Sequence, residues 1–108
     1  MTQYYLYRQA IETTPADITR ISVDYFQPDC AVRKGDLVIV FQSQTLSLLG
    51  AYEFDGAQTL VCKIRLSRSI KEILPSLSFV SEVGENMTRL LKKKTREITR
   101  NDYELLVE

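Results

Sequence analysis

The sequence predicts one α+β domain: a small, curved, mostly antiparallel β-barrel with short flanking helices. Three observations lead to this class. Residues 37–41 form a continuous apolar run, which is typical of a central strand buried on both faces. Shorter apolar stretches on either side of this run are bounded by turn residues, and the helix-capping sequences begin only short segments. No linker or repeat interrupts the chain, so residues 1–108 are expected to fold as a single domain.

The N-terminal half contains three predicted strands. Residues 4–8 are rich in aromatic side chains and read as an opening strand, and residues 21–26 alternate as a strand does. A turn at Gly35 and Asp36 leads into the central run, and Asp36 is expected to order this turn rather than to perform chemistry.

A hairpin is predicted after the central run. Residues 46–54 form its first strand, in which Gly50 favours a bulge or a close approach of two backbones. Asp55 and Gly56 provide the turn signal, and residues 59–66 form the returning strand. Strict alternation in that strand predicts one shared face for four side chains: Leu60, Cys62, Ile64 and Leu66. Cys62 is therefore expected to be a small buried core residue.

Three capping sequences predict the helices. Thr14, Ser69 and Thr99 are each followed three residues later by an acidic residue, as in a capping box. Pro75 is expected to stop the second helix within about two turns, with a further helical turn over residues 77–80. The segment 87–94 is ambiguous between helix and strand.

The composition excludes several kinds of chemistry. The chain has no histidine, which excludes an imidazole base, a Ser-His or Cys-His nucleophile and a His-ligated zinc site. Cys30 and Cys62 form no CxxC pair, and no phosphate-binding glycine motif is present. We therefore expect no metal, no cofactor and no catalytic residue in this chain, and a binding module rather than an enzyme.

The sequence also indicates a cellular compartment. No apolar run is long enough to cross a bilayer, and the first residues do not have the layout of a signal peptide. Two isolated cysteines suit a reducing environment. The expectation is a cytoplasmic protein that does not act on membranes.

Positive charge is concentrated in one part of a chain whose net charge is zero. Residues 63–100 contain ten basic and four acidic side chains, whereas the segments on either side are acidic. A field of one sign on part of a neutral domain favours a polyanionic partner. The alternative is that these lysines and arginines are only a solvated rim.

Several motifs, in this order, resemble a known family. The Lys34-Gly35-Asp36 turn before an apolar strand, and the later Leu48-Leu49-Gly50, are similar to the PUA-like superfamily. The helix at residues 69–74, the Leu77-Ser78-Phe79-Val80 stretch and the closing residues 96–106 resemble the end of EVE domains. The resemblance covers most of the chain and is thin in residues 9–33.

This resemblance implies a function. EVE and related PUA-like domains read a modified base that is flipped out of its strand into an aromatic-lined pocket. Some are the specificity domains of McrB-type, modification-dependent restriction systems. The implied partner is nucleic acid, with modified DNA favoured and RNA possible. An AAA+ GTPase motor, fused to the domain or assembled with it, is the implied protein partner.

Candidate site residues follow from what a flipped base requires. It needs flat apolar surfaces for stacking and polar groups for its Watson–Crick edge. Tyr5, Phe41 and Tyr52 are the candidate rings, because the resemblance places their strands around the cavity; each could equally be a core residue. Gln42 and Ser43 are the candidate hydrogen-bonding residues.

Phosphate contacts are assigned to the basic segment near the C-terminus. The candidates are Arg89, Lys92, Lys93, Lys94 and Arg96. Such contacts position a protein on nucleic acid without reading its sequence. The competing interpretation is a charged edge that discourages strand pairing.

Two other functions remain open at this point. A toxin-like, small-barrel ribonuclease of the MazF type also carries a Gly-Asp turn before an apolar strand, but this chain offers no recognisable catalytic set. A protein-interaction module with no role in nucleic-acid binding is the second alternative.

Overall fold

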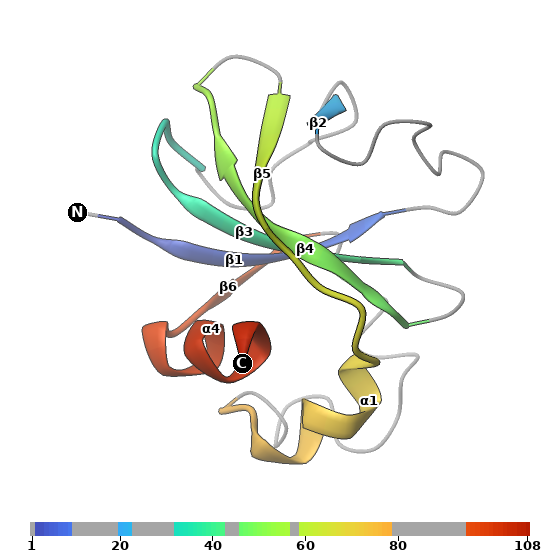
Figure 1. Ribbon diagram of the computed structural model, residues 1–108. Helices are drawn as coiled ribbons and strands as arrows, with labels where there is room; N and C mark the ends of the chain where they lie inside the picture. Colours follow the sequence, from blue (N-terminus) through green and yellow to red (C-terminus); the bar gives the residue numbers. More distant parts are fainter. Residues whose placement is uncertain (1, 10–19, 23–31, 43–45, 57–58, 79–94) are drawn as a thin grey trace.

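The computed structural model describes residues 2–9, 20–22, 32–42, 46–56, 59–78 and 95–108. Four of the predicted features lie outside these ranges: the helix start at Thr14, residues 23–26 of the predicted strand 21–26, Cys30 and the segment 87–94. The described part of the chain is an α+β domain, in which helices pack against one face of a twisted sheet (Figure 1).

The described residues form one six-stranded sheet. All neighbouring strands pair antiparallel except for one parallel pair near the middle. The two outermost of these strands do not pair with each other, so the sheet is open in this part of the chain. The strands in order across the sheet are β2 (Arg20–Ser22), β5 (Thr59–Arg65), β4 (Leu48–Phe54), β3 (Leu37–Gln42), β1 (Tyr4–Gln9) and β6 (Thr95–Ile98).

The predicted central strand is confirmed. Strand β3 lies between β1 and β4, and its residues Val38, Ile39 and Val40 are fully buried. Because successive side chains point to opposite faces of a strand, β3 contributes to two separate cores. Val38 and Val40 face one side of the sheet, and Ile39 and Phe41 face the other.

A buried aspartate fixes the turn that leads into β3. The Asp36 side chain accepts one hydrogen bond from the backbone N–H of Arg33 at 2.8 Å and another from that of Gln3 at 3.1 Å. Gly35 adopts a φ of +91°, which a glycine tolerates without strain, and its N–H donates to the carbonyl of Phe54. Asp36 therefore orders its turn, as predicted, and also connects that turn to the residue before β1.

The two helices with predicted capping boxes in the described part are confirmed. Helix α1 (Ile70–Ile73) begins after Ser69, whose side chain accepts from the N–H of Lys71. The α-helical geometry ends before Pro75, and the chain continues as the 3₁₀ turn η2 (Leu74–Ser76). The predicted helical turn over residues 77–80 is not present at Leu77 and Ser78, and its last two residues lie outside the described ranges.

The C-terminal helix α4 (Arg100–Val107) is held at its start by a buried carboxylate. Thr99 caps the helix and accepts from the N–H of Asp102. The Asp102 carboxylate, which has no exposed surface, accepts from both the backbone N–H and the hydroxyl of Ser78. The capping box was evident in the sequence, but this connection to the segment after η2 was not.

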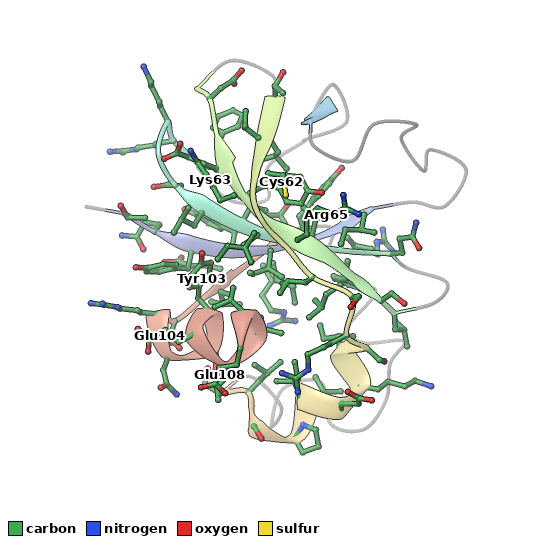
Figure 2. All side chains as sticks on the ribbon, viewed as in Figure 1. Cys62, Lys63, Arg65, Tyr103, Glu104 and Glu108 are labelled. Atoms are coloured by element: carbon green, nitrogen blue, oxygen red, sulfur yellow. The ribbon has the colours of Figure 1, made fainter. Side chains whose placement is uncertain are left out.

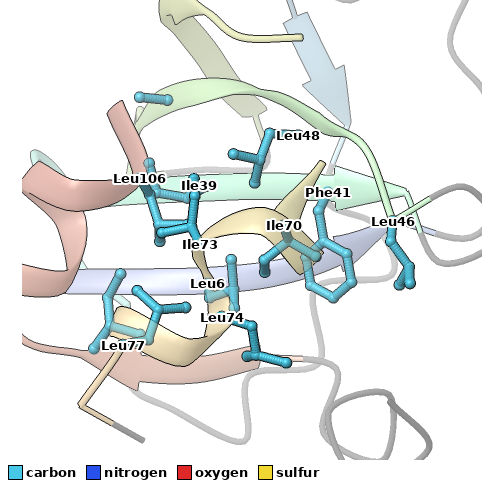
Figure 3. Close-up of a cluster of buried hydrophobic side chains, with 12 residues drawn as sticks. Leu6, Ile39, Phe41, Leu46, Leu48, Ile70, Ile73, Leu74, Leu77 and Leu106 are labelled. Carbon is cyan, nitrogen blue, oxygen red and sulfur yellow. The ribbon is translucent and has the colours of Figure 1, made fainter. Parts of the chain in front are cut away.

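One face of the sheet is covered by these helices. The apolar side chains of α1, η2 and α4 pack onto β1, β3 and β4, and Figure 3 shows Ile73 and Leu106 close to Ile39, with Ile70 beside Phe41. We refer to this group as the helix-side cluster. Its buried members are Leu6, Ile39, Phe41, Leu46, Leu48, Ala51, Ile70, Ile73, Leu74, Leu77, Ile98 and Leu106.

A β-bulge changes the predicted alternation of β5. Tyr52 pairs with Cys62 and Ala51 pairs with Ile64, so Lys63 is an extra residue on β5. Ile64 is consequently directed to the same side as Ala51, away from the face of Leu60 and Cys62. The prediction that Ile64 shares their face is wrong, because strict alternation fails wherever a strand gains one residue.

We predict that Asp36→Asn destabilises the domain. An amide can accept only through its oxygen, so its NH₂ group would oppose one of the two N–H donors, at a cost of about 2–3 kcal/mol. Urea denaturation followed by circular dichroism measures the free energy of unfolding. Asp55→Asn is the matched control, since Asp55 is exposed and accepts from the N–H of Thr59 through one oxygen that asparagine retains. A loss below about 0.5 kcal/mol is expected for the control, and equal losses in the two variants would contradict the role of Asp36.

Candidate nucleic-acid interface

Four aromatic side chains gather on the sheet face opposite the helices. Tyr5 lies beside Val38 in the register, and Val38 lies beside Tyr52, so the two tyrosines belong to one row across three strands. Tyr7 and Phe54 lie two residues further along their own strands and face the same side. We call these residues, with Val38, Val40 and Leu60, the aromatic cluster.

The aromatic cluster is closely packed. Its four rings are between 0% and 8% exposed, and Val32, Leu49 and Cys62 form its partly buried border.

Gly50 allows the ring of Tyr52 to lie close to the backbone of β4. A Cβ atom at position 50 would be 3.2 Å from Cε1 of Tyr52 and only 2.6 Å from the carbonyl oxygen of Ile64. Any side chain here would therefore push β5 away from β4 or displace the ring. The close backbone approach predicted at Gly50 is confirmed.

The structure brings together two of the three predicted base-stacking rings. Tyr5 and Tyr52 share the aromatic cluster, whereas Phe41 belongs to the helix-side cluster on the opposite face. Gln42 ends β3 and is partly exposed, with its backbone paired to Ser47 and Leu46. Ser43, the remaining predicted polar residue, lies outside the described ranges.

Sequence reasoning did not select two further rings of this cluster. Tyr7 is two residues after Tyr5, and Phe54 is two residues after Tyr52. This spacing is the signal that could have found them, because residues two apart on a strand share a face.

Tyr7 is held in an environment that opposes ionisation. Burial raises the pKa of the Tyr7 hydroxyl above its usual 10.0, and the positive charge of Arg8 opposes this shift only in part. The hydroxyl therefore stays protonated at neutral pH and can donate a hydrogen bond inside an apolar cluster.

Of the predicted phosphate-binding residues, Arg96 is the one in the described part of the chain. It pairs with Leu6 across β1 and β6, which directs its partly buried side chain to the helix side of the sheet. Arg89, Lys92, Lys93 and Lys94 lie outside the described ranges.

Another basic stretch begins at Lys63, beside the border of the aromatic cluster, and ends at Lys71 in helix α1 on the helix side of the sheet. Residues 63–71 contain four exposed basic side chains and no acidic one, and we call them the β5 basic segment. Figure 2 shows Lys63 and Arg65 next to Cys62 along β5. The basic members are Lys63, Arg65, Arg68 and Lys71.

Two of these cations have partners in the structure. Lys63 forms an ion pair with Glu53 at 3.3 Å, and both side chains are well exposed. Arg68 donates a hydrogen bond to the carbonyl oxygen of Glu108. Exposed pairs of this kind stabilise a fold by at most about 1 kcal/mol, so an incoming phosphate can compete for these groups.

The outer edge of β5 is covered at one end. Strand β2 pairs only with the first residues of β5, Thr59–Val61. From Cys62 to Arg65, no strand in the described part of the chain pairs with this edge. Cys62 is a free thiol at the border of the aromatic cluster and is only partly buried, contrary to the prediction of a buried core position.

No group of three or more carboxylate or thiol side chains in the described ranges is placed to hold a metal ion. No helix among the residues that the structure describes is long and apolar enough to cross a membrane. Comparison with protein-family models and with curated proteins gives no match to this chain.

We predict that stability falls at alkaline pH and that Tyr7 contributes to the fall. The pKa of Tyr7 is raised in the folded state, so above pH 10 the unfolded chain has released a proton that the native state still holds. The contribution of Tyr7 to the free energy of unfolding is therefore fully present below the pKa of tyrosine in the unfolded chain. It is lost as the pH rises through the pKa of Tyr7 in the folded state. Tyr7→Phe should flatten this decrease in urea denaturation series recorded on both sides of pH 10. Tyr4→Phe is the comparison variant, and an equal flattening in both would contradict the assignment to Tyr7.

Proposed function

We propose that the chain is an EVE-like domain of the PUA-like superfamily that binds nucleic acid, with modified DNA favoured, and reads a flipped base against the aromatic cluster. In this proposal the sheet forms part of a barrel, and the domain provides specificity to a modification-dependent restriction system. An AAA+ GTPase motor would be its partner in the cytoplasm, and any catalysis would reside outside this domain.

One observation carries the proposal. The aromatic cluster lies on the sheet face opposite α1, η2 and α4, and the first cation of the β5 basic segment, Lys63, adjoins its border. Cys62 connects the two, because it pairs with Tyr52 in the register and directly precedes Lys63. Aromatic rings provide a stacking surface for a flipped base, and exposed cations provide contacts to the phosphates beside it.

The energies are compatible with such a reader. Flipping a base costs a few kcal/mol, and stacking on protein rings returns about 1–3 kcal/mol per base. A buried methyl group adds about 0.8 kcal/mol, which is the part that distinguishes a modified base from an unmodified one. Because Tyr5 and Tyr52 are almost fully buried, the base would enter at the partly buried border formed by Leu49 and Cys62.

The buried carboxylates of the described region support binding rather than catalysis. Asp36 and Asp102 each accept two hydrogen bonds that hold backbone segments together. Both carboxylates therefore have a structural role. This is the reason for preferring a reader over a ribonuclease of the small-barrel type.

We predict preferential binding of one modified base and protection of Cys62 by the bound oligonucleotide. Duplexes that carry a methylated cytosine or a methylated adenine are compared with unmodified duplexes by fluorescence anisotropy. In a Cys30→Ser background, the alkylation rate of Cys62 reports on access to the aromatic cluster. The preferred duplex should slow alkylation, and an unmodified duplex should not. If no modification on DNA or RNA is preferred, the reader hypothesis fails.

We further predict that the β5 basic segment supplies phosphate contacts. Each contact contributes about −0.9 to the slope of log K against log salt for duplex DNA. The double variant Arg65→Ala with Lys71→Ala should weaken binding to all sequences alike and reduce the magnitude of the slope by up to about 1.8. Arg100→Ala on α4 is the control, because Arg100 is exposed but ion-paired with Glu104 on the helix. An unchanged slope in the double variant would show that the segment is only a solvated rim.

A further inference from the structure

An exposed isoleucine stands between the cations of β5. Ile64 is 42% exposed, and Lys63 and Arg65 on either side of it are also exposed. The bulge at Lys63 directs Ile64 to the same side of the sheet as Ala51. Ile64 lies in the part of β5 that does not pair with β2. Bulges are frequent at sheet edges and beside functional sites, where they redirect a side chain.

The bulge keeps Ile64 from facing the aromatic cluster. Without the extra residue, Ile64 would face the same side as Leu60 and Cys62, where the aromatic cluster lies. The bulge instead leaves a large apolar side chain 42% exposed beside positive charge. Proteins that distort duplex DNA combine these same two elements, since apolar wedges enter the base stack while Arg and Lys contact phosphates.

We propose that Ile64 is a wedge that enters the base stack where the target base has left it, an inference that rests on the proposed function. The side chains of Lys63, Arg65 and Arg68 would hold the phosphates on either side. The extended chain from Lys63 to Arg68 spans at most about 17 Å. This length corresponds to about five phosphates of one strand along the duplex axis.

In this proposal the two faces of the sheet at β5 have different roles: Ile64 enters the base stack on one face, and the aromatic cluster receives the flipped base on the other. Ile64 pairs with Ala51, and Cys62 pairs with Tyr52, so neighbouring positions on β5 face opposite sides of the sheet. The carbonyl of Ile64 lies against Gly50, beside the ring of Tyr52. A base leaving the stack at Ile64 would thus pass the β5 edge to reach the aromatic cluster.

The experiment uses a duplex in which 2-aminopurine stands next to the target base, because its fluorescence rises when the neighbouring base is unstacked. The wild-type protein should increase this fluorescence. Ile64→Ala should lower the affinity about tenfold and abolish the increase, whereas Ile64→Met should retain both, since methionine also serves as a wedge. Val107→Ala, which shortens a partly buried apolar side chain on α4, is the matched control. Thermal unfolding of each variant verifies that the fold is intact.

The outcomes separate the wedge from the proposed function. Wild-type binding with no fluorescence increase, or an Ile64→Ala variant that matches the wild type, overturns the wedge and leaves nucleic-acid binding in place. If the wild type binds no duplex even at low salt, the proposed function and the wedge both fail. Binding of an acidic peptide in that case would assign the β5 edge to a protein partner.

Discussion

The fold depends on the carboxylate of Asp36. By accepting hydrogen bonds from Gln3 and Arg33, this side chain joins the start of β1 to the turn before β3. Strand β1 is thereby placed parallel to β3, with β6 on its other side, although 27 residues separate the end of β1 from the start of β3. A hairpin cannot produce such a pair, since parallel neighbours need a crossover connection. The buried charge is stabilised because both of its oxygens accept backbone donors.

The parallel pair gives the sheet two different faces. In β1, Tyr5 and Tyr7 face one side and Leu6 faces the other, and β3 alternates in register with it. The helices cover the leucine side, where Asp102 fixes the start of α4 to Ser78. The tyrosine side has no residue of α1, η2 or α4 in its core. The aromatic cluster and the helix-side cluster are therefore separate, and this separation confines the proposed base site to one face.

The strands beyond β3 depart from regular alternation at two places, with consequences for the proposed interface. One irregularity lies between β3 and β4, and the bulge at Lys63 lies between β4 and β5. Gly50 accepts the backbone of β5 at a distance that no side chain would permit. The result is that, on the part of β5 with no outer partner strand among the described residues, Cys62 borders the aromatic cluster while Ile64 faces away from it.

The individual strands and helices follow from local sequence. The apolar run of β3, the Asp55-Gly56 turn and the caps at Ser69 and Thr99 depend on local backbone preferences, so each could be predicted from its own residues. Which of these elements pack together became clear from the three-dimensional arrangement alone. It separated Phe41 from Tyr5 and Tyr52, because the face of a ring depends on the register of its neighbours. It also turned Ile64 outward, because the register of two strands decides which of them takes the extra residue of a bulge, and the glycine signal at Gly50 lies in β4 while the extra residue lies in β5.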